Sequence, residues 1–230
     1  METITSLQTG PLGVNTYIIP LAGHAVIIVD PAACTFTHDE TKITDWLREH
    51  QKSPIGIFIT HGHFDHITGL PVLKNVYPEC RIVIHKDDAA ALGSTTIPSQ
   101  IAALKTMGLE QLLPALQHIP AADLTVSGNE LLNTVFTGNY EKEIKTVLSQ
   151  WKVIHTPGHS KGSVCLYNAV QKELISGDTV FYHSYGRTDL GGDENEIIRS
   201  LVMLKGIIHP DTIVYPGHDY YGFTFAENFR

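Results

Sequence analysis

The chain has 230 residues, of which 43% are hydrophobic and 17% charged, a composition typical of a soluble domain with a sizeable core. Its formal net charge of -8, without any run rich in Lys or Arg, argues against nucleic acid as a partner. No stretch approaches the roughly 18 apolar residues of a membrane span, and the start lacks a secretory-signal pattern. We therefore expect a cytoplasmic protein that does not bind membranes. The three cysteines do not form a disulfide framework.

Strands and helices alternate along most of the chain. The pattern predicts strands at 3–9, 15–20 and 25–30, a helix at 38–51, a strand at 55–60, a helix that carries Ile67, Leu70 and Leu73, and a strand at 81–85. The final third predicts strands at 151–156, 163–168, 172–178 and 212–217, with a helix at 195–208. This alternation is typical of an α/β fold, which we expect to form one domain over residues 1–230.

The segment from about 86 to 150 is less regular and predicts a helical insertion with one or two weak strands. Its leucines would either cover a functional site, form a subunit contact, or simply pack on the rest of the domain. The oligomeric state, monomer or homodimer, stays open.

Polar clusters follow the apolar runs at four places. The sequence THGHFDHITG at 60–69 follows a predicted strand, and PGHS, GDTVF and HDYYG follow three later ones. Loops beyond strand ends are where a rigid scaffold brings distant side chains together. Seven side chains are therefore candidate metal ligands: His61, His63, Asp65, His66, His159, Asp178 and His218.

These seven residues suit two adjacent divalent ions. His61 and His63 point to one side of an extended backbone and form a three-imidazole set with His159. Asp65 and His66 would form a second set with His218, and the two oxygens of Asp178 could bridge the ions. Zinc is the expected metal, with iron or manganese as alternatives. For isolated histidines elsewhere, including His85 and His155, we expect a structural role.

The chain resembles the metallo-β-lactamase superfamily over residues 15–222. The resemblance is carried, in order, by the motifs THGHFDHITG, TPGHSKGS, SGDTVF and YPGHDYYG. The resemblance implies a four-layer αββα sandwich with a metal site at one edge. Asp178 and the histidine after Asp65 argue against β-lactamase activity.

Within the superfamily, the chain is most similar to hydroxyacylglutathione hydrolases (glyoxalase II) and their short bacterial relatives, through VNTYII, DPA, WKVIHTPGHS, GRTDLGGD and PGHDY. That resemblance implies that Arg187 and Tyr220 contact the glutathione part of a substrate. The chain stops at Arg230, whereas the larger enzymes continue into a helical domain with further basic contacts, so the thiol carrier is left open.

The mechanism that follows is hydrolysis of a small anionic thioester by a metal-bound hydroxide. Asp65 and Asp178 are the expected catalytic side chains, Asp65 as a ligand that also accepts a proton. A thiolate leaves with little acid assistance, which fits a motif set without an obvious further acid. Phe181, Tyr182, His183 and Tyr185 either wall the substrate pocket or pack within their own loop.

Other activities remain open. Persulfide dioxygenases resemble the chain through GRTD and HDYYGFT, and the matching His61, His159 and Asp178 would hold one Fe(II). Against that reading, Gly217 stands where alanine is expected, and GRTDLGG lacks the aromatic residue and glutamine that usually follow. A phosphodiesterase acting on RNA ends would need a basic exosite, and a non-catalytic metal-binding protein is the last alternative.

Overall fold

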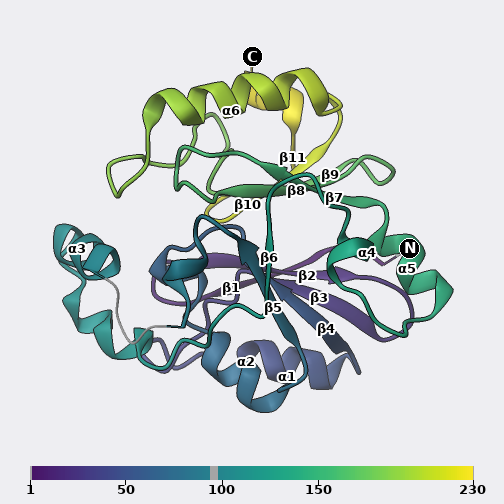
Figure 1. The fold of residues 1–230 in the computed structure, drawn as a ribbon, viewed down its shortest axis with the longest axis horizontal. Coiled ribbons are helices and arrows are strands. Elements are labelled where there is room, and N and C mark those ends of the chain that lie inside the picture. Colours follow the sequence, from purple (N-terminus) through teal and green to yellow (C-terminus); the bar gives the residue numbers. More distant parts are fainter. Residues whose placement is uncertain (1, 94–97, 230) are drawn as a thin grey trace.

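The computed structural model describes residues 2–93 and 98–229 and contains two β-sheets packed face to face with helices outside them (Figure 1). The first sheet has six strands in chain order: β1 (Thr5–Thr9), β2 (Val14–Pro20), β3 (Ala25–Val29), β4 (Ser53–Phe58), β5 (Arg81–His85) and β6 (Leu124–Val126). Strands β1 to β3 are antiparallel, and β3 to β6 are parallel.

The second sheet has the order β11-β10-β9-β8-β7. Its strands are β7 (Trp151–His155), β8 (Val164–Asn168), β9 (Glu173–Gly177), β10 (Ile213–Pro216) and β11 (Phe223–Thr224). Only β9 and β10 are parallel in this sheet. Helices α1 (Lys42–Glu49) and α2 (Leu70–Val76) cover the outer face of the first sheet, and α6 (Glu194–Ile207) covers the second (Figure 1).

Three apolar layers hold the four structural layers together. Because successive side chains of a strand face opposite sides, Ile18 and Ile28 pack toward α1 and α2, whereas Ile19 and Ile27 face the second sheet. A third cluster, which includes Leu204, joins α6 to the second sheet. The αββα sandwich expected from the sequence is confirmed.

The segment from 86 to 150 contributes to the sheet as well as to helices. Strand β6 pairs with β5, and the helical parts are α3 (Pro98–Met107), α4 (Leu132–Val135), α5 (Lys142–Leu148) and the 3-10 turns η2 (Ala89–Ala91) and η3 (Glu110–Leu116). Helix α3 projects at the side of the sandwich (Figure 1).

The first helix is shorter than the sequence pattern predicts. It begins at Lys42 rather than His38, because His38 has a positive φ of 57° and the next residues form a turn. In that turn, the carboxylate of Asp39 accepts hydrogen bonds from the backbone N–H groups of Gly10 and Cys34.

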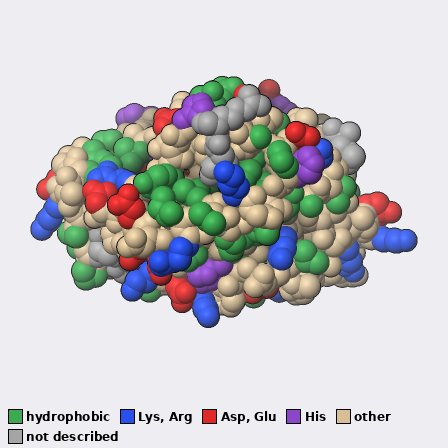
Figure 2. All heavy atoms as spheres, turned by 90° about the horizontal axis from the view of Figure 1, so that it is seen from above, with side chains coloured by type: hydrophobic (Ala, Val, Ile, Leu, Met, Phe, Trp, Pro, Cys, Tyr) green, Lys and Arg blue, Asp and Glu red, His purple; other side chains and the backbone are tan. Residues whose placement is uncertain are grey.

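The outer surface of α6 is mixed in character. Asp193 caps the helix by accepting a hydrogen bond from the N–H of Glu196 at 2.9 Å. The view onto this face shows hydrophobic atoms among charged ones (Figure 2), and Val202 on α6 is 68% exposed. Among the described residues, no helix combines the length and the apolar character needed to cross a bilayer.

Candidate metal centre

All seven side chains that the sequence singled out converge at one edge of the sandwich. They lie beyond the carboxyl ends of β4, β7, β9 and β10, which point to the same edge, and β4 leads into the 3-10 turn η1 (Phe64–His66). Five of them are buried: His61, Asp65, His66, His159 and Asp178. Burying that many polar groups is costly unless they are paired or bind a metal.

The ring nitrogens of His61, His63 and His159 face one another. Nδ1 of His63 lies 2.8 Å from Nε2 of His159, which lies 3.1 Å from Nε2 of His61. This three-imidazole set matches the first of the two predicted sets.

The second set is formed by Asp65, His66 and His218. Nε2 of His218 lies 3.2 Å from Nε2 of His66 and 3.2 Å from Oδ2 of Asp65. Nε2 of His66 lies 3.6 Å from the same oxygen of Asp65.

Asp178 lies between the two sets. Its Oδ2 is 3.4 Å from Nε2 of His159 and 3.6 Å from Nε2 of His218, and its Oδ1 is 3.5 Å from Nε2 of His66. Oδ1 is buried and has no hydrogen-bond partner among the described residues. A buried carboxylate oxygen without a hydrogen-bond donor is available to bind a cation.

The hydrogen bonds of the imidazoles fix where their lone pairs point. Nδ1 of His159 donates to the carbonyl oxygen of Arg187 at 2.7 Å, and Nδ1 of His218 donates to that of Leu12 at 3.2 Å. Because a carbonyl can only accept, Nε2 of each ring in its neutral form carries a lone pair that faces other ligand atoms. Lone pairs at these separations repel unless a cation lies between them. The site therefore fits divalent metal ions, which imidazole binds at about 2.0–2.1 Å in the case of zinc.

Asp30, which the sequence did not single out as a site residue, orients two of these imidazoles. Its Oδ1 accepts the N–H of Thr60 at 2.7 Å, and its Oδ2 accepts the Thr60 hydroxyl at 2.6 Å and Nδ1 of His66 at 3.0 Å. The Thr60 hydroxyl in turn accepts from Nδ1 of His61 at 3.0 Å. The only sequence signal is an aspartate at the end of a buried strand, before Pro31. Such partners of metal-binding histidines fix ring orientation.

A second aspartate without a predicted role, Asp88, joins two loops of the site. Its Oδ2 accepts hydrogen bonds from the N–H of Gly62 at 2.8 Å and the hydroxyl of Ser160 at 2.6 Å. Its Oδ1 accepts the N–H of Gly162 at 2.8 Å. Asp88 therefore connects the loop of His61 and His63 to the loop of His159.

The electrostatics keep the first set neutral and make the second set strongly polar. Burial, reinforced by His159, lowers the pKa of His63 to about 4. Burial opposes a charge on His66, but the carboxylates of Asp65, Asp178 and Asp30 more than offset it and raise the pKa of His66 to about 10. Burial alone would raise the pKa of Asp65, but His66 and His218 hold it well below its usual range. Near neutral pH the first set offers lone pairs, whereas His66 of the second set carries a proton that a bound ion would have to displace.

A pocket of about 270 Å³ opens onto both sets. Its apolar walls come from separate parts of the chain: Leu12, Phe64, Met107, Phe181 and Leu190. Met107 belongs to α3, so the segment from 86 to 150 supplies part of the wall. Phe181 is the member of the aromatic stretch after Asp178 that lines the pocket, while Tyr182, His183 and Tyr185 are exposed.

A family model described as the Metallo-beta-lactamase superfamily matches residues 9–218. The chain belongs to this superfamily. Among individual relatives, it is 27% identical to the "Probable metallo-hydrolase YqgX" of Bacillus subtilis, over 92% of this chain and 88% of that protein. It is 28% identical to a "Hydroxyacylglutathione hydrolase" of Tolumonas auensis, over 93% of this chain but only 65% of that longer protein.

Two solved metallo-β-lactamase-fold structures align with nearly the whole chain. One is the BLEG-1 B3 metallo-beta-lactamase, with a TM-score of 0.76 and 25% identity over 99% of this chain and 96% of that one. The other is TTHA1623 in a di-iron-bound form, with a TM-score of 0.72 and 26% identity over 98% and 97%. Divalent metals at this edge of the fold are thus consistent with the family and with the ligand geometry.

The two predicted substrate contacts lie in different surroundings. Arg187 lines the pocket at the metal edge, where its guanidinium forms a two-point ion pair with the Asp189 carboxylate at 2.6 and 2.7 Å. Tyr220 is 61% exposed and packs against the ring of Tyr182, outside the lining of that pocket. Its contact with a substrate remains a prediction.

A further His and Asp cluster is less suited to a metal than the superfamily site. His85 and His155, near Asp87, stack with ring centroids 4.1 Å apart and an interplanar angle of 14°. Imidazole lone pairs lie in the ring plane, so two nearly parallel rings cannot direct them at one ion. The stacking agrees with the structural role expected for both histidines.

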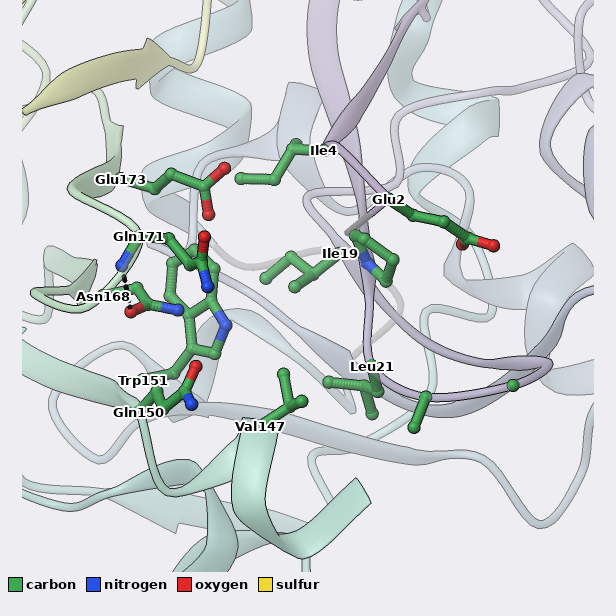
Figure 3. Close-up of a pocket in the computed structure, with 13 residues that line it drawn as sticks. Glu2, Ile4, Ile19, Leu21, Val147, Gln150, Trp151, Asn168, Gln171 and Glu173 are labelled. Atoms are coloured by element: carbon green, nitrogen blue, oxygen red, sulfur yellow. Dashed lines mark hydrogen bonds between the residues drawn. The ribbon is translucent and has the colours of Figure 1, made fainter. Parts of the chain in front are cut away.

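A second pocket, of about 240 Å³, lies at the opposite end of the sandwich. Glu173 lines it at the start of β9, whereas Asp178 follows the end of the same strand. Figure 3 shows the Glu173 carboxylate pointing into this pocket, whose other walls include Ile4, Ile19 and Trp151. Burial raises the pKa of Glu173 to about 7.

Proposed function

We propose that this chain is a binuclear metal-dependent hydrolase of a thioester, such as an S-2-hydroxyacylglutathione or a related acyl-thiol of the cytoplasm. The observation that carries the proposal is the position of Asp178 between two complete ligand sets. His61, His63 and His159 would hold one ion, and Asp65, His66 and His218 the other. We expect the site to bind two zinc ions, with iron or manganese as alternatives. The relative named hydroxyacylglutathione hydrolase supports the thioester substrate, and the di-iron neighbour supports a site for two ions.

When bound, two divalent ions supply a nucleophile from water near neutral pH and polarise the carbonyl under attack. The chain itself contributes the remaining elements. Asp65 stays ionised near neutral pH, which suits a cation ligand; it is also the proposed proton acceptor, although His66 and His218 hold its pKa low and make it a weak base. The thiolate that departs is a weak base and needs no dedicated acid, which fits a pocket with no further acidic group beside the ligand sets except Asp219.

The pocket walls suit a small anionic thioester. The apolar side chains of Phe64, Met107 and Phe181 exclude water around an acyl chain. Arg187, at the same pocket, offers a positive charge to an anionic carrier, although Asp189 already neutralises part of it.

The test combines metal analysis with turnover on one preparation. Protein purified without oxygen should contain about two metal ions per chain and hydrolyse S-D-lactoylglutathione. Asp178→Ala should abolish turnover and reduce metal content, while Asp211→Ala, which removes an exposed carboxylate far from the site, should change neither.

Three results would contradict the proposal. One iron per chain, no hydrolysis and oxygen uptake with glutathione persulfide would identify a dioxygenase instead. Hydrolysis of a β-lactam in preference to every thioester tested would favour the activity named for the BLEG-1 neighbour. Full turnover in Asp178→Ala would show that the site described here is not the catalytic one.

A further inference from the structure

Gly217 lies next to the Asp178 carboxylate, which faces both ligand sets. It follows β10 and precedes His218. A Cβ atom built at this position would stand 2.2 Å from Oδ1 of Asp178 and 2.8 Å from Cε1 of His66. Both distances are far shorter than van der Waals contact, so any side chain at 217 must displace those groups.

The absence of a side chain at 217 is explained by space and not by backbone conformation. Gly217 is not among the residues with positive φ, whereas Asp219, two residues later, has a φ of 62°. An L-residue is therefore not strained at 217 by its φ angle. What a larger residue lacks there is room.

The backbone at 217 is held firmly in place. Its N–H donates to the carbonyl of Gly177 at 2.9 Å, and its carbonyl accepts the N–H of Asn15 at 2.7 Å. The preceding carbonyl, of Pro216, accepts hydrogen bonds from the hydroxyl of Tyr17 at 2.7 Å and the amide of Asn15 at 3.1 Å. A methyl group at 217 would therefore be accommodated by movement of Asp178 and His66 rather than by movement of the strand.

Both contacts of the added Cβ lie on the side of the second set, whereas the other oxygen of Asp178, Oδ2, lies 3.4 Å from Nε2 of His159 in the first set. Oδ1 of Asp178 is the oxygen that faces His66, and His66 is a member of the second set. No atom of His61, His63 or His159 is among the three nearest to the added Cβ. We propose that Gly217 determines how many ions the chain binds, because its missing side chain lets Asp178 face the second set. This inference rests on the metal centre of the proposed function.

The direct test is a zinc titration of Gly217→Ala in competition with a chromophoric chelator. The first ion should bind as in the wild type, while affinity for the second should fall about 10- to 100-fold, the range typical of perturbed ligand surroundings. Gly206→Ala is the matched control, because a Cβ there meets nothing within 4 Å. That control should bind two ions with wild-type affinities. Two tight ions in Gly217→Ala would overturn the proposal.

A second measurement tests the proposal even if Gly217→Ala folds poorly. In metal-free protein, Gly217→Ala should lower the Tm. This drop should be less than half as large in an Asp178→Ser background, because the shorter serine side chain removes the contact with the added methyl group. An equal drop in both backgrounds would show that Asp178 is not what the methyl displaces. Neither readout involves turnover, so a wild type that binds two zinc ions without hydrolysing thioesters would refute the proposed function and leave this inference standing.

Discussion

Two carboxylates outside the seven-residue set, Asp30 and Asp88, flank the loop that carries His61 and His63. Asp30 follows β3 and holds Thr60 and His66, whereas Asp88 follows β5 and holds Gly62. Since β4 lies between β3 and β5, the loop after β4 is fixed from both sides by the strands next to it. Asp88 also accepts hydrogen bonds from Ser160 and Gly162, in the loop between β7 and β8, so it helps to set the separation within the three-imidazole set.

Asp88→Asn is expected to weaken the first metal ion selectively. Asparagine keeps one acceptor oxygen but turns an amide N–H₂ toward groups that already donate, so at least one of the three hydrogen bonds is lost. We expect about a 10- to 100-fold loss of zinc affinity at one site, measured by chelator competition. Asp87→Asn, the same change at the adjacent exposed residue, should leave the affinity unchanged. Equal affinities in the two variants would contradict a positioning role for Asp88.

A buried hydrogen bond connects helix α3 to the metal edge, in addition to the packing of Leu104 in the core. The amide of Gln100 donates to the carbonyl of Gly62 at 2.7 Å, and Gln100 is only 5% exposed. Met107, at the other end of α3, lines the pocket over the ligands. The helix therefore forms part of the wall of the pocket over the ligands, and its hydrogen bond ties it to the Gly62 loop.

Gln100→Ala should loosen this wall without emptying the metal site. Removing a buried hydrogen bond and leaving the Gly62 carbonyl without its donor costs about 1–3 kcal/mol of stability. Because the wall is then held less firmly, we expect the KM for a thioester to rise several-fold. Metal content per chain should stay at the wild-type value. Gln117→Ala, an exposed glutamine beyond η3, serves as the control. A variant with unchanged KM would show that α3 does not shape the pocket.

The side chains that the sequence singled out, and that converge in the structure, are those of distinct chemistry that recur at strand ends. His61, His63, Asp65 and His66 sit within six residues, and their density alone indicated a site. The partners Asp30 and Asp88 carry no such pattern, because their hydrogen bonds join residues 26 to 74 positions apart, and only the folded sheet order brings them together. The start of α1 was missed for a related reason, since the turn at Asp39 depends on a contact with Gly10.

The pH dependence of the stability of the folded chain tests the burial of Glu173, which lies far from the metal edge. Burial raises the pKa of Glu173 to about 7, above its ordinary value of 4.5, so between these pH values the native state holds a proton that the unfolded state releases. Stability from this group is therefore full below about pH 4.5 and is lost as the pH rises toward 7. Glu173→Gln, which cannot ionise, should be more stable than the wild type at pH 8 by about 1 kcal/mol, a figure reduced because the carboxylate is partly exposed to solvent. Urea unfolding at pH 4.5 and pH 8 would measure the difference, which should nearly vanish at the lower pH. Glu79→Gln makes the same charge change on the surface, and an identical pH response in both variants would show that Glu173 is not the responsible group.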